Sequence, residues 1–343
     1  MIRKGKRRIM TAVCAVLALQ TATAQDTRSM PPVVLRIDTA NFVRYDQDTT
    51  DWTRLATAPG IATPLPFAAP AFASYVAIGD VVAVNGRPVK GVRVLRGLNV
   101  AFAKNPAPKQ AVADLTGNPY FDQYFVIQDL DGSVIGTLAI TGLQITDPAP
   151  ATSGLNGWGQ VVVGGTGAFL GVTGQGCGVS GGGTRPGGER RTSVTEDPAN
   201  RQVNGGGSTF SVLCLIPLVR PQVVSTQNGP AVVHSNDFSL VTSAKPAKAG
   251  ELLTLFATGL GPTRPGVDPG QAFASDPLQR STSPVDITVN GAAAEVLYSG
   301  GYPGTSDVYQ VNFRAPSAVT PGLTKLQISA AWIPGPEITI AVQ

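Results

Sequence analysis

The densest cluster of side chains that could carry chemistry lies in the segment YFDQYFVIQ. Phenolic and polar side chains occupy one set of alternate positions: Tyr120, Asp122, Tyr124 and Gln128. Because side chains in a strand alternate between its two faces, these four would share one face, and Phe121, Phe125 and Ile127 the other. If the first face lines the inside of a closed sheet, an acid among phenols could bind or protonate a small ligand. The alternative is that the Phe/Ile face is core and the polar face meets solvent. Asp38 and Asp80, near expected strand ends, are weaker candidates of the same kind.

A hydrolase motif is present in form but lacks the structural context that its chemistry needs. Residues 178–182, GVSGG, fit G-x-S-x-G, and Asp197 and His234 follow in hydrolase order. A nucleophile elbow requires a helix directly after its serine, whereas glycines and Pro186 follow Ser180. The sequence therefore assigns no catalytic residue, and we favour a protein that is not an enzyme.

Metal ligands are scarce. Asp46, Asp48 and Asp51 form an acidic run, but an EF-hand needs glycine at its sixth position and glutamate at its twelfth, and here these are Asp51 and Thr57. We interpret the run as a solvated turn, with a weak irregular calcium site as the alternative. Outside the apolar N-terminal stretch that contains Cys14, the chain has one histidine and two cysteines, which are too few ligands for a zinc site. We predict no metal and no cofactor.

The first 24 residues have the pattern of an export signal. Basic residues precede the apolar stretch Ile9–Leu19, and Ala22-Thr23-Ala24 is an A-x-A cleavage site. We expect a secreted or periplasmic protein whose mature chain begins near Gln25, after cleavage at Ala24. No later segment reaches the roughly 18 apolar residues of a spanning helix, so no membrane span is expected.

Removing the signal changes the charge balance. The chain has 26 Lys and Arg against 22 Asp and Glu, but five of the basic residues precede residue 25, which leaves 21 against 22. Without an excess of basic residues, the charge of the mature chain does not favour a nucleic-acid partner, and we predict none.

Cys177 and Cys214 are the cysteines that remain after cleavage. In an oxidising compartment an even pair predicts a disulfide, the alternative being two buried thiols.

The spacing of strands and turns predicts an all-β protein. The chain contains 40 glycines and 28 prolines and has no long helical periodicity. Asn85-Gly86 and Asp131-Gly132 are hairpin turns between apolar runs, since both central residues of such turns need positive φ. About eight strand-like segments between Val33 and Ile216 predict an antiparallel β-barrel, with 181–207 as a mobile loop.

A second set of strands follows a boundary at Pro217–Pro221. Seven segments match the strand pattern: Asp237–Val241, Leu252–Thr258, Val285–Val289, Ala292–Tyr298, Val308–Phe313, Lys325–Ser329 and Glu337–Val342. Seven short strands in about 120 residues are typical of a β-sandwich. The predicted organisation is a signal peptide at 1–24, a barrel at 30–218 and a sandwich at 222–343.

Glycines recur at alternate positions 174, 176 and 178, next to the corner GGTG. Glycine weakens a strand unless another backbone must come close or the sheet must bend sharply. We expect these glycines to let a small barrel close, rather than to make room for a ligand.

The segment VVVGGTGAFLGVTGQG at 161–176 resembles the GGTG-x-[FY]-x-x-x-x-G signature of dirigent and allene-oxide-cyclase-like barrels. The matching positions are Gly164, Gly165, Thr166, Gly167, Phe169 and Gly174; Thr173 stands where the family usually has a basic residue. The resemblance implies a barrel that binds small apolar or aromatic molecules. Members of the family cyclise an allene oxide or guide phenoxy-radical coupling without a cofactor. They are often trimeric, so the resemblance also implies a homo-oligomer.

Three segments, at 247–263, 284–300 and 307–322, resemble a C-terminal domain repeated across secreted bacterial proteins. This resemblance implies an immunoglobulin-like β-sandwich without established chemistry. We therefore predict a secreted barrel that binds a small apolar or aromatic ligand, or an extracellular protein or glycan partner, joined to an accessory module. The alternative is a cofactor-free isomerase or cyclase, or a dirigent-like stereochemical guide.

Overall fold

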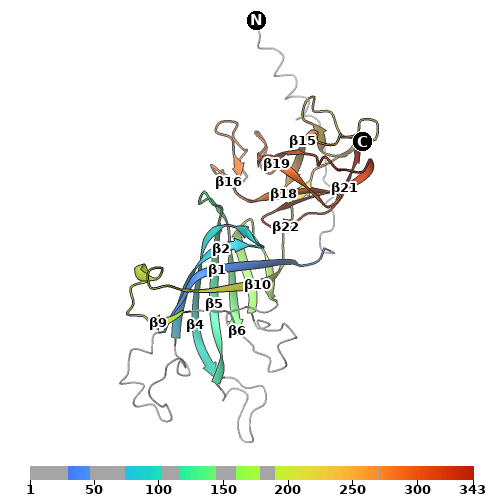
Figure 1. Cartoon of the computed structure of the whole chain (residues 1–343). Coiled ribbons are helices and arrows are strands. Elements are labelled where there is room, and N and C mark those ends of the chain that lie inside the picture. Colours follow the sequence, from blue (N-terminus) through green and yellow to red (C-terminus); the bar gives the residue numbers. More distant parts are fainter. Residues whose placement is uncertain (1–29, 47–73, 102–115, 144–159, 178–189, 269) are drawn as a thin grey trace, which may run out of the picture. The chain divides into compact units, whose positions relative to one another are not determined.

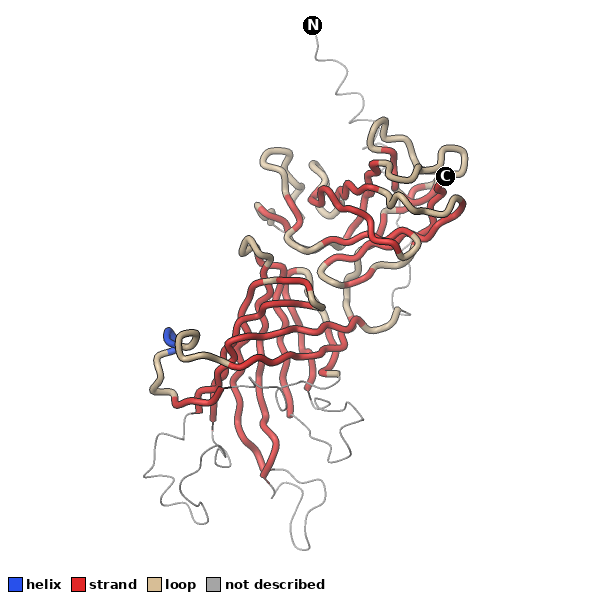
Figure 2. The backbone as a smooth tube through the Cα atoms, in the orientation of Figure 1, coloured by secondary structure: helices blue, strands red, loops and turns tan. Residues whose placement is uncertain are grey.

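A computed structural model of the chain describes residues 30–46, 74–101, 116–143, 160–177, 190–268 and 270–343 (Figure 1). The described residues form strands and one short 3-10 helix, Pro198–Asn200, so the predicted all-β class is confirmed (Figure 2). The chain divides into two compact units, Pro32–Val219 and Arg220–Gln343, the second of which also includes the described residues Met30 and Pro31.

The first unit is one sheet that returns on itself. Its strands are β1 (Val33–Asp46), β2 (Ser74–Val84), β3 (Arg87–Pro88), β4 (Lys90–Ala101), β5 (Thr116–Gln128), β6 (Val134–Leu143), β7 (Gln160–Gly167), β8 (Thr173–Gly176), β9 (Arg190–Ser193) and β10 (Gly207–Ile216). Neighbouring strands pair in the order β2-β4-β5-β6-β7-β8-β10-β1, and β1 pairs again with β2. The sheet therefore closes on itself, and we call these eight strands the ring. β9 lies beside β1 and runs parallel to it.

Turn chemistry explains the hairpins of the ring. Asn85 and Gly86 have φ of 48° and 79°, as the predicted turn requires. The second turn differs from the prediction: only Gly132 has a positive φ, of 88°, and its N–H donates to the carbonyl of Asp129, so Leu130 and Asp131 are the central residues. β1 is one continuous strand that passes through a register shift between Thr39 and Phe42. Asn41 lies within this shift and has φ of 49°, so the bulge bends β1 without ending it.

One face of the ring strands is buried and forms the core. The largest fully buried side chains on this inner face include Leu35, Ile37, Phe125, Leu138, Leu213 and Leu215. The alternate residues of the same strands point outward; Val34, for example, is 54% exposed. Burial of apolar surface on the inner face contributes about 25 cal/mol per Å² and is the main stabilisation of the ring.

The glycines of β8 serve close strand pairing. β8 pairs with β7 on one side and β10 on the other, and Gly174 lies opposite Leu215. A Cβ atom on Gly174 would lie 2.1 Å from the carbonyl oxygen of Cys214, and its φ of +154° also disfavours a side chain. Gly178 lies outside the described residues. Gly174 therefore allows β8 to pair closely with β10 where the ring closes.

The disulfide that the sequence predicts is present. Cys177 and Cys214 are bonded, with Cα atoms 5.6 Å apart, and the bond joins the end of β8 to β10. Cys177 also donates its backbone N–H to the carbonyl of Val212. The covalent bond therefore reinforces the same strand pair that the glycines bring together.

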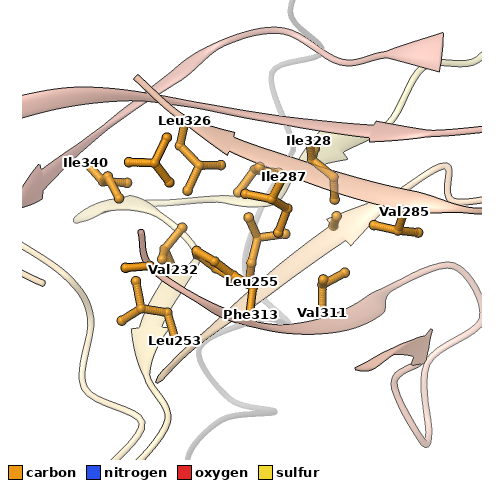
Figure 3. Close-up of a cluster of buried hydrophobic side chains, with 14 of the residues drawn as sticks. Val232, Leu253, Leu255, Val285, Ile287, Val311, Phe313, Leu326, Ile328 and Ile340 are labelled. Carbon is orange, nitrogen blue, oxygen red and sulfur yellow. The ribbon is translucent and has the colours of Figure 1, made fainter. Parts of the chain in front are cut away.

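The second unit contains more strands than the sequence predicts. They are β11 (Gln222–Val223), β12 (Ser225–Thr226), β13 (Gly229–Pro230), β14 (Val232–His234), β15 (Leu252–Thr258), β16 (Thr263–Arg264), β17 (Arg280–Ser281), β18 (Val285–Val289), β19 (Ala292–Gly301), β20 (Tyr309–Arg314), β21 (Gly322–Ala330), β22 (Ile333–Pro334) and β23 (Ile338–Val342). The main path is β11-β15-β20-β19-β18-β21-β22. Side chains of β15 and β20, such as Leu255 and Phe313, pack in one cluster with Ile287, Leu326 and Ile340 from β18, β21 and β23 (Figure 3).

One predicted strand of the second unit is wrong. The strand is β14, a turn at 235–237 follows it, and within 237–241 Leu240 makes only an isolated antiparallel bridge to Val233. The carboxylate of Asp237 accepts hydrogen bonds from the backbone N–H and the hydroxyl of Ser239, and Phe238 has φ of 56°. This local bonding competes with an extended chain, which the apolar pattern alone does not reveal.

A pair of matched substitutions tests the role of the β8 glycines. Gly174→Ala should lower the free energy of unfolding of the ring by about 3 kcal/mol, because a methyl group there meets a backbone oxygen that cannot move alone. Gly164→Ala, where a Cβ meets nothing within 4 Å, is the control and should change it by less than about 0.5 kcal/mol. Urea unfolding followed by circular dichroism measures both. Equal effects would contradict the closure argument.

Removing the disulfide should destabilise the first unit selectively. The bridge spans a sequence separation of 37 residues, and closing such a loop in the unfolded chain corresponds to about 4 kcal/mol before strain. In calorimetry of the Cys177→Ser/Cys214→Ser double variant, we expect a lower unfolding temperature for the ring and an unchanged transition for the second unit. Thiol titration of the unfolded wild type should find neither residue reactive; two free thiols there would refute the bond.

Candidate functional site

The four residues predicted as an inward pocket wall lie on the outer face of the ring. Tyr120 and Tyr124 are 40% and 57% exposed, and Asp122 and Gln128 are half-buried. The Asp122 carboxylate accepts a hydrogen bond of 2.6 Å from Thr141, whose hydroxyl also lies 3.2 Å from the Tyr120 phenol oxygen. The premise of an inward site is wrong, because the Phe/Ile face of β5 is the core. Ligand binding by these residues stays a prediction for an outward surface.

Asp38 and Asp80 also point away from the inner face. Asp38 forms an exposed ion pair of 2.9 Å with Arg36. Asp80 is bound by Arg201 at 2.5 Å and by Asn41 at 2.8 Å. Burial opposes ionisation of Asp80, but the hydrogen bonds from Arg201 and Asn41 outweigh it and lower the pKa. Both acids hold structure on the outside of the ring.

A polar layer crosses the inner face at Arg93 of β4. Arg93 is 7% exposed; its Nε donates to the Gln123 side-chain oxygen at 2.8 Å and its terminal nitrogen to the Thr209 hydroxyl at 3.3 Å. The centre of its guanidinium lies 4.4 Å from the Phe42 ring centroid and 5.5 Å from that of Phe125. Cation–π contacts of this kind stabilise a desolvated arginine.

Gly79 of β2 leaves room for two side chains of β1 beside Arg93. Gly79 lies opposite Arg93 in the β2–β4 pair, and a Cβ there would lie 2.5 Å from Thr39 Cγ2 and 2.8 Å from Phe42 Cδ2. Because β2 has no side chain at this position, Thr39 and Phe42 can approach it. Arg93 extends from β4 past β2 and β1 to Thr209 on β10. We call Arg93, Gln123, Thr209 and Thr39 the polar layer.

A second charged group lies further along the inner face, at the end of β1. Arg44 and Asp46 form an ion pair of 2.7 Å with side chains only 6% and 5% exposed. The Arg44 guanidinium lies 3.5 Å from the centre of the Tyr75 ring, and Tyr75 is opposite Asp46 in the strand pair. Arg191 of β9 approaches Asp46 at 3.9 Å. Asp46 is therefore not part of a solvated turn as predicted, while Asp48 and Asp51 lie outside the described residues.

The segment predicted as a mobile loop is, in its described part, folded against β1. In residues 190–206, Arg190 forms two hydrogen bonds of 2.8 and 2.6 Å with Glu196, which also accepts from Thr192 at 2.7 Å. Arg190 and Thr192 thereby lower the pKa of Glu196 to about 2. The Tyr45 hydroxyl is buried without a hydrogen-bond partner among the described residues. Burial, followed by the Glu196 charge, raises the pKa of Tyr45. Ion pairs order this segment, although its composition is typical of disordered chains.

The remaining members of the hydrolase motif have structural roles. The Asp197 carboxylate accepts the backbone N–H of Ala199 and caps the 3-10 helix at 2.9 Å. In the second unit His234 is 3% exposed, and its Nδ1 lies 2.6 Å from Glu251. Ser180 lies outside the described residues.

The sequence contains no clear signal for the polar layer. In VKGVRVL, apolar residues occupy both sets of alternate positions, so Arg93 could equally face outward. An arginine flanked by two valines in a strand, two positions after a glycine, is the only hint.

Comparison with known proteins adds no assignment: no protein-family model, curated protein or solved structure matches the chain. Among the described residues, no cluster of three His, Cys, Asp or Glu side chains could hold a metal ion. The same residues include no helix long and apolar enough to cross a membrane.

The Arg190–Glu196 pair makes the 190–206 segment acid-sensitive. Because the pKa of Glu196 is lowered from 4.5 to about 2 in the folded protein, its contribution is full above pH 4.5 and is lost as the pH falls toward 2. Protection of amides 190–206 against hydrogen exchange should fall between pH 4.5 and 2.5. Glu196→Gln should have low protection at every pH, without this step. Glu295→Gln, at an exposed pair in the second unit, is the control. An unchanged pH step in Glu196→Gln would contradict the assignment.

Proposed function

We propose that the first unit is an eight-stranded antiparallel β-barrel of the dirigent and allene-oxide-cyclase-like type, and that it binds a small aromatic or apolar ligand on its inner face. The closed path of strand pairs and the position of the GGTG segment at the end of β7 support the barrel. Phe169 of the signature is fully buried, and a Cβ on Gly165 would lie 2.8 Å from its Cβ, so the motif acts as a packed corner.

The observation that carries the binding proposal is the pair of guanidiniums stacked on aromatic rings inside the ring. Arg93 lies between Phe42 and Phe125, and Arg44 lies over Tyr75. Burying an arginine costs several kcal/mol of desolvation, and apolar residues of the same volume stabilise a core at least as well. A purely structural inner face would gain nothing from such residues. Aromatic walls with a few polar groups are the usual lining of a small-molecule site.

One observation favours a catalytic alternative. Asp46 and Tyr75 present a carboxylate and a phenol to the same part of the inner face, opposite each other in the β1–β2 pair. An acid and a phenol in that arrangement could exchange a proton with a bound ligand, as a cofactor-free isomerase, cyclase or dirigent-like guide would need. The ion pair of Asp46 with Arg44 makes a binding role the better-supported of the two.

We also propose that the protein acts after export, with the second unit as an immunoglobulin-like accessory module. The signal-like residues 1–24 and the Cys177–Cys214 disulfide both fit an oxidising compartment. An extracellular protein or glycan, or a second copy of the chain, would contact the outer face of the ring, where Tyr120 and Tyr124 are exposed.

Native mass spectrometry of protein purified from its own source tests the binding proposal. We expect a retained small molecule that dissociates on unfolding. Ala77→Val narrows the inner face beside Phe42 and Tyr75, and should reduce the occupied fraction at least fivefold. Ala139→Val makes the same change on the opposite, outward set of alternate positions and should leave occupancy unchanged. Absence of any ligand from the wild type, or loss with the outer variant alone, would contradict inner-face binding.

A further inference from the structure

The hydroxyl of Thr39 is an unexplained polar group inside the ring. Thr39 is 2% exposed, and its Oγ1 has no hydrogen-bond partner among the described residues. An unsatisfied buried hydroxyl costs roughly 1–3 kcal/mol, whereas valine has almost the same shape and no such cost. Such a group in a folded protein points to a ligand, a water molecule or a catalytic role.

The position of Thr39 relates it to Arg93. Thr39 lies opposite Thr209 in the β1–β10 pair, and Thr209 accepts the hydrogen bond from Arg93. Thr39 also packs beside Gly79, the residue opposite Arg93 in the β2–β4 pair. The unsatisfied hydroxyl and the guanidinium therefore belong to one layer of the inner face, formed by strands adjacent in the ring.

The charge of this region is positive. Arg44, Arg93 and Arg191 lie along the inner side of the described strands, and Asp46 is the one carboxylate that these strands present there. Phe42 and Phe125 provide apolar surface on either side of Arg93. A ligand that fits this environment has an anionic oxygen next to an aromatic or aliphatic body.

We propose that the polar layer binds the carboxylate of a small aromatic or apolar acid. One carboxylate oxygen accepts a hydrogen bond from Thr39 Oγ1, and the negative charge lies against the guanidinium of Arg93, while Phe42 and Phe125 contact the body of the ligand. This inference rests on the proposed ligand-binding function and specifies the chemical class of its ligand.

Calorimetric titration with matched acid and amide pairs tests the proposal. The probes are cinnamate and decanoate, each compared with its primary amide, on the full mature chain. We expect the wild type to bind at least one acid ten times or more tightly than its amide. Equal binding of acid and amide would overturn the carboxylate proposal and leave the binding function intact. Failure of all four probes, together with native protein that retains no ligand, would contradict both.

Thr39→Val separates a binding role from a structural one. The substitution keeps the shape of the side chain and removes the unsatisfied hydroxyl, so it should raise the unfolding temperature of the ring while weakening acid binding about five- to twentyfold. Amide binding should not change. Thr141→Val, on the outer face, is the matched control and should leave both affinities unaltered. If Thr39→Val leaves acid affinity unchanged, the hydroxyl does not bind the carboxylate and the proposal is wrong.

Discussion

The need to close the sheet determines most of the first unit. β1 must pair with β2 and β10 at once, and β8 must fit between β7 and β10. Small rings bend sharply, so they need bulges and glycines where backbones approach. The bulge after Thr39 and the glycine at 174 satisfy this need, and the Cys177–Cys214 bond secures the last strand pair.

Closure also creates the environment in which chemistry is feasible. A ring places one face of every strand in a shared interior, so residues distant in sequence meet there. Arg93 of β4 reaches Thr209 of β10 past two intervening strands, β2 and β1. The polar layer is thus formed by side chains of strands that the closed sheet brings together. Its stacked guanidinium and unsatisfied Thr39 hydroxyl are costly in a core, which is the physical reason to consider them functional.

The 190–206 segment shows how charge can replace apolar burial as an organising force. It contains few large apolar residues, yet the Arg190–Glu196 pair joins two parts of the segment, and Arg201 holds it to Asp80 of β2 and to the carbonyl of Asn41 in β1. Single surface ion pairs contribute little, but here they are part of a network with Thr192 and Asn41. The stability of this segment therefore depends on pH and salt more than that of the ring core does.

Sequence alone determined the all-β class, the turn at Asn85-Gly86, the position but not the type of the turn at Asp131-Gly132, and the pairing of Cys177 with Cys214, because these depend on local backbone preferences and on the cysteine count. Only the tertiary structure decided which face of each strand lies inside. Period-two alternation divides β5 into two faces without saying which one is buried, so the predicted wall at Tyr120–Gln128 lies on the outside. The inner placement of Arg93 and Asp46 depends on contacts between strands far apart in the chain, and local pattern contains no information about those contacts.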